Sequence, residues 1–462
     1  MKGNAVKSKR VRRPRSPLAL VNPDAAGIDC GLAEHYVAVP QDRDPEHVRR
    51  FRTFTEDLHR LADWLVSCGI KTVAMEATGV FWIPVYEILE ARGLQVLLVN
   101  ARHVKNVPGR KSDVADCEWL QQLHSVGLLR GSFRPAADIA ALRSYLRHRE
   151  SLVQAASTAL QRMQKALVQM NLQLQVVITD ISGTTGLRII RDIIAGQTDP
   201  RQLAKHRNAR CNSSEAEIAA ALTGNYRPEH VFVLQQNLEI FDALQRQIES
   251  CDKRVEAHLQ QLTAKAPHAS KPIPAARPRR RSRGEPPFDL RIPLHQLTGA
   301  DLSQIDGIGP YNAVRLISEI GTDMSRWATE RHFTSWLTLA PNNKISGGRL
   351  LSSRTQPSTN RAAAILRVAA MSLSRTDTAL GAFYRRLAGR IGKAKAITAT
   401  ARKLATLVYR CLKGDIVYKD PGAAAYDRHH RESVLRRLRH RAASLGFTLV
   451  NQQTGEILEG VS

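Results

Sequence analysis

The chain has 462 residues and is 43% hydrophobic, which is enough to form several folded domains of ordinary size. Its 68 Lys and Arg outnumber its 42 Asp and Glu, so the formal net charge is +26, and a surplus this large favours a polyanionic partner. No apolar run reaches the roughly 18 residues of a membrane span, so we expect nucleic acid rather than a membrane. A merely basic protein without such a partner is the alternative.

The N-terminal segment 1–20 is a basic tail without the apolar core of a signal peptide. The six cysteines are scattered and form no CxxC pair, which argues against a zinc site. We therefore expect reduced thiols and a cytoplasmic protein.

Residues 21–137 are predicted to form an α/β domain, because strand patterns alternate with helix patterns. The expected strands are two around a turn within 25–39, then Arg49–Phe54, Lys71–Glu76 and Gly93–Val99. The expected helices are Asp57–Cys68, Pro84–Arg92 with Pro84 opening it, and one that starts at Asp113 after a loop at His103–Ser112.

Residues 138–263 are predicted to be helical. Apolar side chains recur at spacings of three and four from Leu142 to Leu174 and from Leu234 to Leu259, which indicates two long helices of coiled-coil character. The simplest arrangement is an antiparallel hairpin with a small helical insert at about 183–225. The pattern leaves open whether the apolar stripes form an intramolecular core or a dimer interface.

The C-terminal half divides into three segments. Residues 264–297 are a Pro/Arg-rich linker, in which Arg279, Arg280 and Arg281 are candidate phosphate contacts, a solvated tether being the alternative. Residues 298–420 are expected to form a mostly helical domain. Residues 421–462 are a basic tail with a short amphipathic helix after Tyr426.

Four acidic residues form a candidate metal site. Asp29 lies inside one apolar strand and Glu76 ends another, and a carboxylate there needs hydrogen bonds or a cation. Asp113 and Asp116 are three residues apart, on one face of a helix. Such oxygen ligands suit Mg²⁺, with Mn²⁺ as a substitute, and two such ions would support phosphoryl transfer. A helix cap at Asp113 and a surface role for Glu76 are the alternatives.

The turn DGIGP at Asp306–Pro310, followed by an apolar helix, is similar to a helix-hairpin-helix. In such a turn Gly307 and Gly309 would offer backbone N–H groups to a DNA phosphate. A plain turn between two helices is the alternative.

Several runs resemble the DEDD transposases of bacterial insertion sequences, the IS110 family. They are GIDCGLAEHYVAV, VAMEATGVFW and KSDVADCEWLQQLHSVGLLRGSFRP, followed by IDGIGPYNAVRLISEIG, FTSWLTLAPNNKISGGR and NRAAAILRVAAMSL. The resemblance covers about 25–135 and 300–415. It implies a RuvC-like (ribonuclease-H-like) first domain, a second catalytic domain, and enzymatic cutting and rejoining of DNA.

The resemblance also implies a nucleophile. In this family a serine of the second domain is thought to form a phosphoserine link with DNA, and the matching position is Ser346. Ile345 stands where the family often has a second serine. Lys344, Arg349 and Arg354 could neutralise charge that develops on the phosphate. An ordinary loop serine is the alternative, with Ser352 and Ser353 as further candidates for the nucleophile.

A structured non-coding guide RNA, paired with donor and target DNA, is the remaining partner that the resemblance implies. Because exchange of two duplexes requires several strand cuts, we expect a homo-oligomer, a dimer of dimers, with the helical hairpin as its interface. Two other functions stay open: a metal-dependent endonuclease of the Holliday-junction resolvase type, and a non-catalytic nucleic-acid-binding protein with the same fold.

Overall fold

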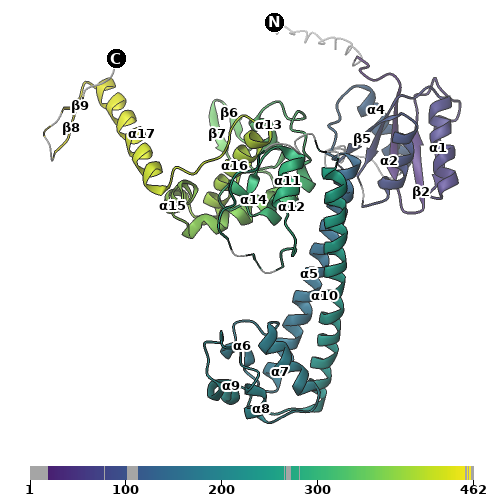
Figure 1. The fold of residues 1–462 in the computed structure, drawn as a ribbon. Coiled ribbons are helices and arrows are strands. Elements are labelled where there is room, and N and C mark those ends of the chain that lie inside the picture. The colour runs from purple at the N-terminus through teal and green to yellow at the C-terminus, as the bar shows by residue number, and fades with distance from the viewer. Residues whose placement is uncertain are drawn as a thin grey trace, which may run out of the picture. The chain divides into compact units, whose positions relative to one another are not determined.

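The computed structural model describes residues 19–77, 79–100, 113–264, 266, 272–279, 281–282, 284–452, 455 and 457–458. The chain divides between Arg134 and Pro135 into two compact units, which Figure 1 shows and which are described separately below. In the described part of the chain, no helix is both long enough and apolar enough to cross a membrane.

The first unit is built on one mixed sheet with the strand order β3-β2-β1-β4-β5. The strands are β1 (Ala25–Cys30), β2 (Glu34–Ala38), β3 (Val48–Arg52), β4 (Thr72–Glu76) and β5 (Gln95–Val99). β1 pairs antiparallel with β2 and parallel with β4, and β4 pairs parallel with β5. Each strand predicted in this region is present, with ends that differ by a few residues.

Helices cover both faces of this sheet. On one face α1 (Thr55–Ser67) and α2 (Trp82–Ala91) share a core with the strands, in which Leu61 and Val85 are fully buried. On the other face α4 (Asp113–Ser125) packs Leu120 against β4 and β5. α2 begins at Trp82, two residues before the proline predicted to open it. The predicted loop His103–Ser112 lies outside the described residues except for its flanks.

The second unit begins with two long helices that lie side by side, α5 (Ala137–Gln169) and α10 (Pro228–Thr263) (Figure 1). They are antiparallel, because His258 near the end of α10 contacts the carbonyl of Asp138 at the start of α5. Many apolar side chains of the two helices are buried in one core within this chain. These side chains therefore form an intramolecular core. Coiled-coil character and a role in oligomerisation stay predictions.

The helical insert between these helices begins earlier than predicted. It comprises α6 (Leu174–Val177), α7 (Thr184–Ile194), α8 (Pro200–Ala204) and α9 (Glu215–Ala221). α5 ends at Gln169, and Asn171 then adopts a φ of 58°, a left-handed conformation that a helix cannot continue through. Leu174, which fits the apolar period of α5, therefore belongs to the insert.

A buried ion pair interrupts the apolar contact between the two long helices. Arg149 on α5 and Asp252 on α10 are joined at 2.5 Å (Nε to Oδ1), and their side chains are 2% and 7% exposed. Arg149 also donates to the Gly284 carbonyl at 2.7 Å and to the Tyr311 hydroxyl at 3.0 Å. Removing one partner of a buried pair costs about 3–5 kcal/mol, so this pair holds α5 on α10, while the other two contacts of Arg149 link α5 to the chain that follows α10.

The remainder of the second unit is mostly helical, as predicted. Its elements are α11 (Arg291–Thr298), η1 (Leu302–Gln304), α12 (Pro310–Ile320), α13 (Glu330–Trp336), β6 (Lys344–Ser346), β7 (Arg349–Ser352), α14 (Arg361–Ser372), η2 (Leu373–Arg375), α15 (Ala379–Ile391), α16 (Lys393–Leu412), α17 (Ala423–Ser444), β8 (Leu449–Val450) and β9 (Ile457–Leu458). α16 is central and packs against α13, α14 and α15.

α17 differs from its prediction. The expected helix after Tyr426 is present and spans 22 residues, but Ala423 is its single buried residue, so the helix has no apolar face. Its apolar side chains fall among arginines and histidines that surround the helix axis, and Leu438 is exposed. The predicted helix is therefore present, but the prediction that it is amphipathic was wrong.

Asp301 ties α11 to the segment that leads into α12. Its carboxylate accepts from the Ser303 hydroxyl at 2.6 Å, from the Gln304 amide at 2.9 Å and from the Arg291 guanidinium at 2.7 Å. Burial alone would raise the pKa of Asp301, but these hydrogen bonds and the Arg291 charge outweigh burial and lower it.

We expect Asp301→Asn to destabilise the fold at neutral pH but not in acid. Because the folded pKa lies below the ordinary value of 3.8, the carboxylate stabilises the fold above that pH, and this contribution is lost as the pH falls through the folded value. The difference in unfolding free energy between wild type and variant should therefore shrink below about pH 4, as urea denaturation at several pH values would measure. Exposed Asp377, changed to Asn, is the control. A difference that stays constant with pH would contradict the assignment.

Candidate metal centre and nucleic-acid interface

Asp29 and Glu76 lie side by side at one end of the sheet. In the parallel pairing of β1 and β4, Ile28 is opposite Met75, so the two acids are the next residues on neighbouring strands. Both are half-buried, whereas the residue before each is fully buried. Since side chains alternate along a strand, Asp29 shares a face with Gly27, and this is the face that α4 covers.

Helix α4 runs opposite to β1 and starts near these acids. The amide of Gln121 donates to the Ala25 carbonyl at 3.3 Å, and one turn earlier Cys117 lies against Gly27. Four residues of helix rise about 6 Å, close to the 6.6 Å or so of two strand residues. The backbone of Asp113 therefore lies at about the level of Asp29.

The electrostatics agree with this placement. Burial raises the pKa of the Cys30 thiol, and the negative charges of Asp29 and Glu76 raise it further. Burial likewise raises the pKa of Cys117 to about 12, with smaller contributions from nearby charges that include Asp29. The negative charge of Asp29 thus reaches Cys117 of α4, the residue that follows the half-buried Asp116.

The side chain of Asp113, one of the four predicted ligands, lies outside the described residues. Among the side chains that are described, no three His, Cys, Asp or Glu residues are close enough to hold a metal ion. The structure therefore brings Asp29 and Glu76 together and directs the start of α4 toward them. It leaves the ligand geometry as a prediction.

Gly27 is a residue that the sequence analysis missed. A Cβ at this position would lie 2.3 Å from the Cys117 carbonyl oxygen and 2.4 Å from the Gln121 nitrogen, both of them backbone atoms of α4. A glycine inside a central strand is itself a signal of close backbone approach, and it could have identified this contact. The glycine sets how near α4, with its two aspartates, lies to the sheet.

We expect Gly27→Ala to destabilise the first unit by about 1–3 kcal/mol, because the helix backbone must move to admit the methyl group. Thermal or urea unfolding of the full chain would measure this loss. Gly389→Ala in α15 is the matched control, since its Cβ would meet nothing within 4 Å and alanine favours a helix. Equal stability of the two variants would mean that α4 does not pack on Gly27 in this way.

Ser346 ends the first strand of a two-stranded hairpin, not an irregular loop. β6 and β7 pair Ser346 with Arg349 across a two-residue turn, in which Gly347 and Gly348 have φ values of 54° and 75°. Positive φ at both positions defines a type I′ turn, which glycine forms most readily. Residues 341–351 are all exposed, so the Ser346 hydroxyl, Lys344 and Arg349 are accessible, as is Arg354 beyond them.

The DGIG turn is held from two sides. Asp306 is paired with Arg277 of the linker and accepts from the Tyr418 hydroxyl at 2.7 Å. Gly307 has a φ of 82°, and a Cβ there would lie 2.8 Å from the Ala369 carbonyl oxygen of α14. Packing against α14 thus explains why this position is a glycine, and the contact of Gly307 with a DNA phosphate stays a prediction.

The linker arginines predicted to contact phosphate differ from one another. Arg279 is paired with Glu285, and its Nη1 lies 2.6 Å from where a Cβ of Gly309 would be, so this arginine covers the start of α12. Arg281 is exposed, and Arg280 lies outside the described residues. The structure therefore brings one of the three together with the DGIG turn.

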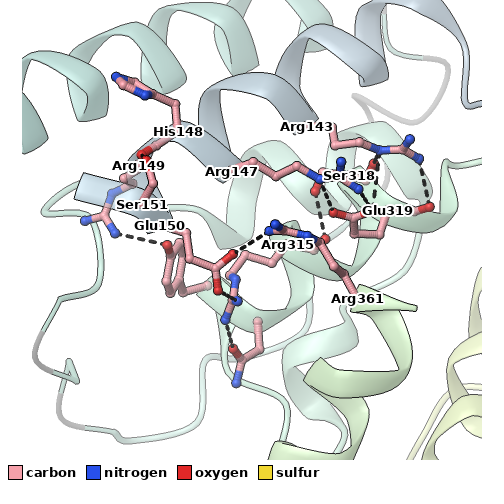
Figure 2. A network of polar contacts seen from close by, with 12 residues as sticks. Arg143, Arg147, His148, Arg149, Glu150, Ser151, Arg315, Ser318, Glu319 and Arg361 are labelled. Carbon is pink, nitrogen blue, oxygen red and sulfur yellow. Dashed lines mark hydrogen bonds and ion pairs between the residues drawn. The ribbon is translucent and has the colours of Figure 1, made fainter. Parts of the chain in front are cut away.

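A cluster of arginines and glutamates that the sequence analysis missed joins α5 to α12 and α14 (Figure 2). Arg147 makes a two-pronged contact with Glu319 at 2.8 and 2.7 Å, and Arg143 donates to the Ser318 carbonyl at 2.8 Å. Glu150 is paired with Arg315 of α12 and with Arg361 of α14. The cluster lines a cavity of about 450 Å³ and fixes the C-terminal domain on the helical pair.

Positive charge is concentrated in the C-terminal domain. Residues 331–414 contain sixteen Lys and Arg and a single acidic residue, Asp377. Such a distribution is the electrostatic footprint of a nucleic-acid-binding surface.

A mixed sheet with paired acids at one end, in a chain that also has a strongly basic helical region, is consistent with a ribonuclease-H-like enzyme that acts on a nucleic acid. Comparison with known families identifies it further. The model of the IS110 DEDD domain, described as a transposase, matches residues 26–172, and the model described as "Transposase IS116/IS110/IS902 family" matches residues 299–385. The chain belongs to the IS110 family of transposases.

It follows that the protein is an enzyme and that DNA is its partner. DEDD-type transposase domains typically use divalent metal ions. The comparison with curated proteins gives no match.

Proposed function

We propose that this transposase cuts and rejoins the DNA of an insertion sequence through a phosphoserine link at Ser346, with divalent metal ions held by Asp29, Glu76, Asp113 and Asp116. The observation that carries the proposal is the position of α4 along the strands of the sheet. The contacts of α4 at Gln121 and Cys117, and the parallel pairing of β1 with β4, support a site in which the first turn of α4 faces the two strand-end carboxylates.

The donor set fits a hard divalent cation. All four ligands are carboxylates, and oxygen ligands of this kind suit Mg²⁺, with Mn²⁺ as a substitute. When bound, the metal ions would polarise the phosphate and stabilise the leaving oxygen. The protein's part is to hold Asp29 and Glu76 on rigid strands and to bring α4 close through Gly27. We further propose that the sheet domain is RuvC-like in its details.

Ser346 would supply the covalent step. Its Oγ attacks the phosphorus, the bond from phosphorus to the departing deoxyribose oxygen breaks, and the serine proton passes to a base or to water. In rejoining, a deoxyribose hydroxyl of the other strand attacks the phosphoserine and the serine hydroxyl is restored. Arg349, paired with Ser346 across the hairpin, and Lys344 are exposed cations that could neutralise the phosphate.

We propose that a structured non-coding RNA guides this reaction and that the active assembly is a homo-oligomer, a dimer of dimers, acting on DNA in the bacterial cytoplasm. The sixteen cations against one acid in residues 331–414 support a surface that carries polyanions. If RNA pairing supplies the sequence specificity, the protein needs few base-specific contacts.

The test is recombination between a donor and a target plasmid, with and without the RNA transcribed from the DNA that flanks the gene. We expect joined products only when RNA and Mg²⁺ are both present. Efficient recombination without the RNA would refute guidance, while leaving the chemistry intact. Cleavage of branched DNA without any joined product would support the alternative, an endonuclease of the Holliday-junction resolvase type.

A further inference from the structure

The β6–β7 hairpin exposes large apolar side chains beside the proposed nucleophile. Ile345, Leu350 and Leu351 are 65%, 58% and 68% exposed, although each could be buried in a protein core. Exposed apolar side chains gathered in one place mark a surface that meets a partner. The attack on phosphate that is proposed for Ser346 does not require these apolar side chains.

The register of the hairpin determines on which face each side chain lies. Ile345 is paired with Leu350, and Ser346 is paired with Arg349. Since cross-strand partners share a face and successive residues alternate, one face of the hairpin tip is apolar and the opposite face carries the serine and the arginine. The register shift between Lys344 and Ile345 leaves Leu351 as an extra residue next to the apolar pair.

The surroundings of the hairpin indicate what the apolar face meets. Between Glu330 and Asp377 the chain has seven Lys and Arg and no acidic residue. An apolar protein partner would not require so one-sided a charge, whereas DNA combines a polyanionic backbone with apolar base faces. A two-stranded ribbon is also of a size that a DNA groove admits.

We propose that the apolar face formed by Ile345 and Leu350 is a wedge that enters the DNA base stack and opens the base step next to the phosphate attacked by Ser346. Aliphatic side chains of this kind unstack base pairs in other DNA-binding proteins, and cations beside them hold the backbone. The turn formed by Gly347 and Gly348 makes the tip narrow enough to enter. The location of the opened step rests on the proposed function, but the unstacking itself does not.

The test uses the full-length protein with the guide RNA and a donor duplex that contains the element end. The fluorescent base 2-aminopurine is placed at each step of this duplex in turn, and its emission rises when the base unstacks. Ser346→Ala, which keeps both wedge residues, should raise the emission at one step several-fold. In the double variant Ile345→Ala and Leu350→Ala this rise should be lost, while the salt dependence of DNA binding is unchanged.

Recombination supplies a second measurement. The double variant should recombine a matched duplex about tenfold less efficiently than wild type, and a mismatch at the opened step should restore most of that loss, because a mismatched step is already easy to unstack. The variant Gln356→Ala, at an exposed residue beyond the hairpin, is the control and should recombine as wild type does. Circular dichroism and thermal unfolding would establish that the double variant is folded.

Two outcomes would overturn the wedge. One is an unchanged fluorescence rise in the double variant. The other is a change in oligomeric state of the DNA-free double variant in sedimentation, which would mean that the apolar face binds a second copy of the chain. If the proposed function is wrong, the wild-type protein forms no covalent adduct with DNA. The fluorescence measurement does not depend on that adduct and can still be interpreted.

Discussion

Ser346→Ala should abolish the covalent protein–DNA adduct and lower recombination by at least about 10⁴-fold, the order of loss expected when a nucleophile is removed. Alanine has no oxygen with which to form the phosphoester. The hairpin should stay folded, since Ser346 is exposed and the turn depends on Gly347 and Gly348. The measurement is a denaturing gel of labelled donor DNA, on which the adduct migrates with the protein.

Two nearby serines provide the matched comparison. Ser352 ends β7, where it is paired with Lys344, and Ser353 follows it, so both lie near Ser346 but outside the pair that it forms with Arg349. Ser352→Ala and Ser353→Ala should each keep the adduct at wild-type yield, and mass spectrometry of the trapped peptide should place the phosphate on Ser346. An adduct that persists in Ser346→Ala and maps to either neighbour would show that the nucleophile was misassigned.

The sequence predicts the elements of the sheet domain well because their patterns are local. β1 and β4 are apolar runs, and the helices of the first unit follow the spacing of buried residues. Gly27 shows where such reasoning ends. Its importance depends on Cys117 and Gln121, some ninety residues along the chain, and no local pattern links them.

The same limit applies to the polar contacts of the second unit. Arg149 lies on the buried side of α5, where the apolar period predicts a hydrophobic residue, and its partner Asp252 is on another helix. A charged residue at such a position signals a buried ion pair, but the identity of the partner requires the fold. The hairpin at Ser346 is a different case, because two consecutive glycines between the short runs Ile345–Ser346 and Arg349–Leu350 predict a type I′ turn from the local sequence alone.

For the candidate metal site, residue types and order were predictable and adjacency was not. Asp29 and Glu76 become neighbours through the parallel register of β1 with β4, which a sequence does not specify. The spacing of Asp113 and Asp116 places both on one helix face, but only the packing of α4 turns its first turn toward the strand ends. The strand register, the spacing of the two aspartates and the packing of α4 together identify the carboxylates to substitute in a test of the site.

Asp29→Asn and Glu76→Gln should each remove the stabilisation that Mg²⁺ gives the protein and lower recombination by at least about 10²-fold. Each amide keeps the size of the side chain but loses the negative charge that a hard cation requires. At a Mg²⁺ concentration of 100 times Kd, binding would stabilise the wild-type fold by about 2.7 kcal/mol. Thermal unfolding of the full chain, with and without Mg²⁺ and again with Mn²⁺, measures this directly and does not depend on DNA.

Glu118→Gln is the matched control for charge. Glu118 is on α4, two residues beyond Asp116, but its carboxylate is 3.1 Å from the His47 ring nitrogen. This variant should keep both the metal-dependent stabilisation and recombination, whereas Asp116→Asn should lose both. If Asp29→Asn and Glu76→Gln unfold at the same Mg²⁺-raised temperature as wild type, the two strand-end carboxylates do not hold the metal. If they lose the metal effect but still form the adduct at Ser346, the covalent step proceeds without the metal site. The phosphate charge would then be neutralised by Lys344, Arg349 or Arg354.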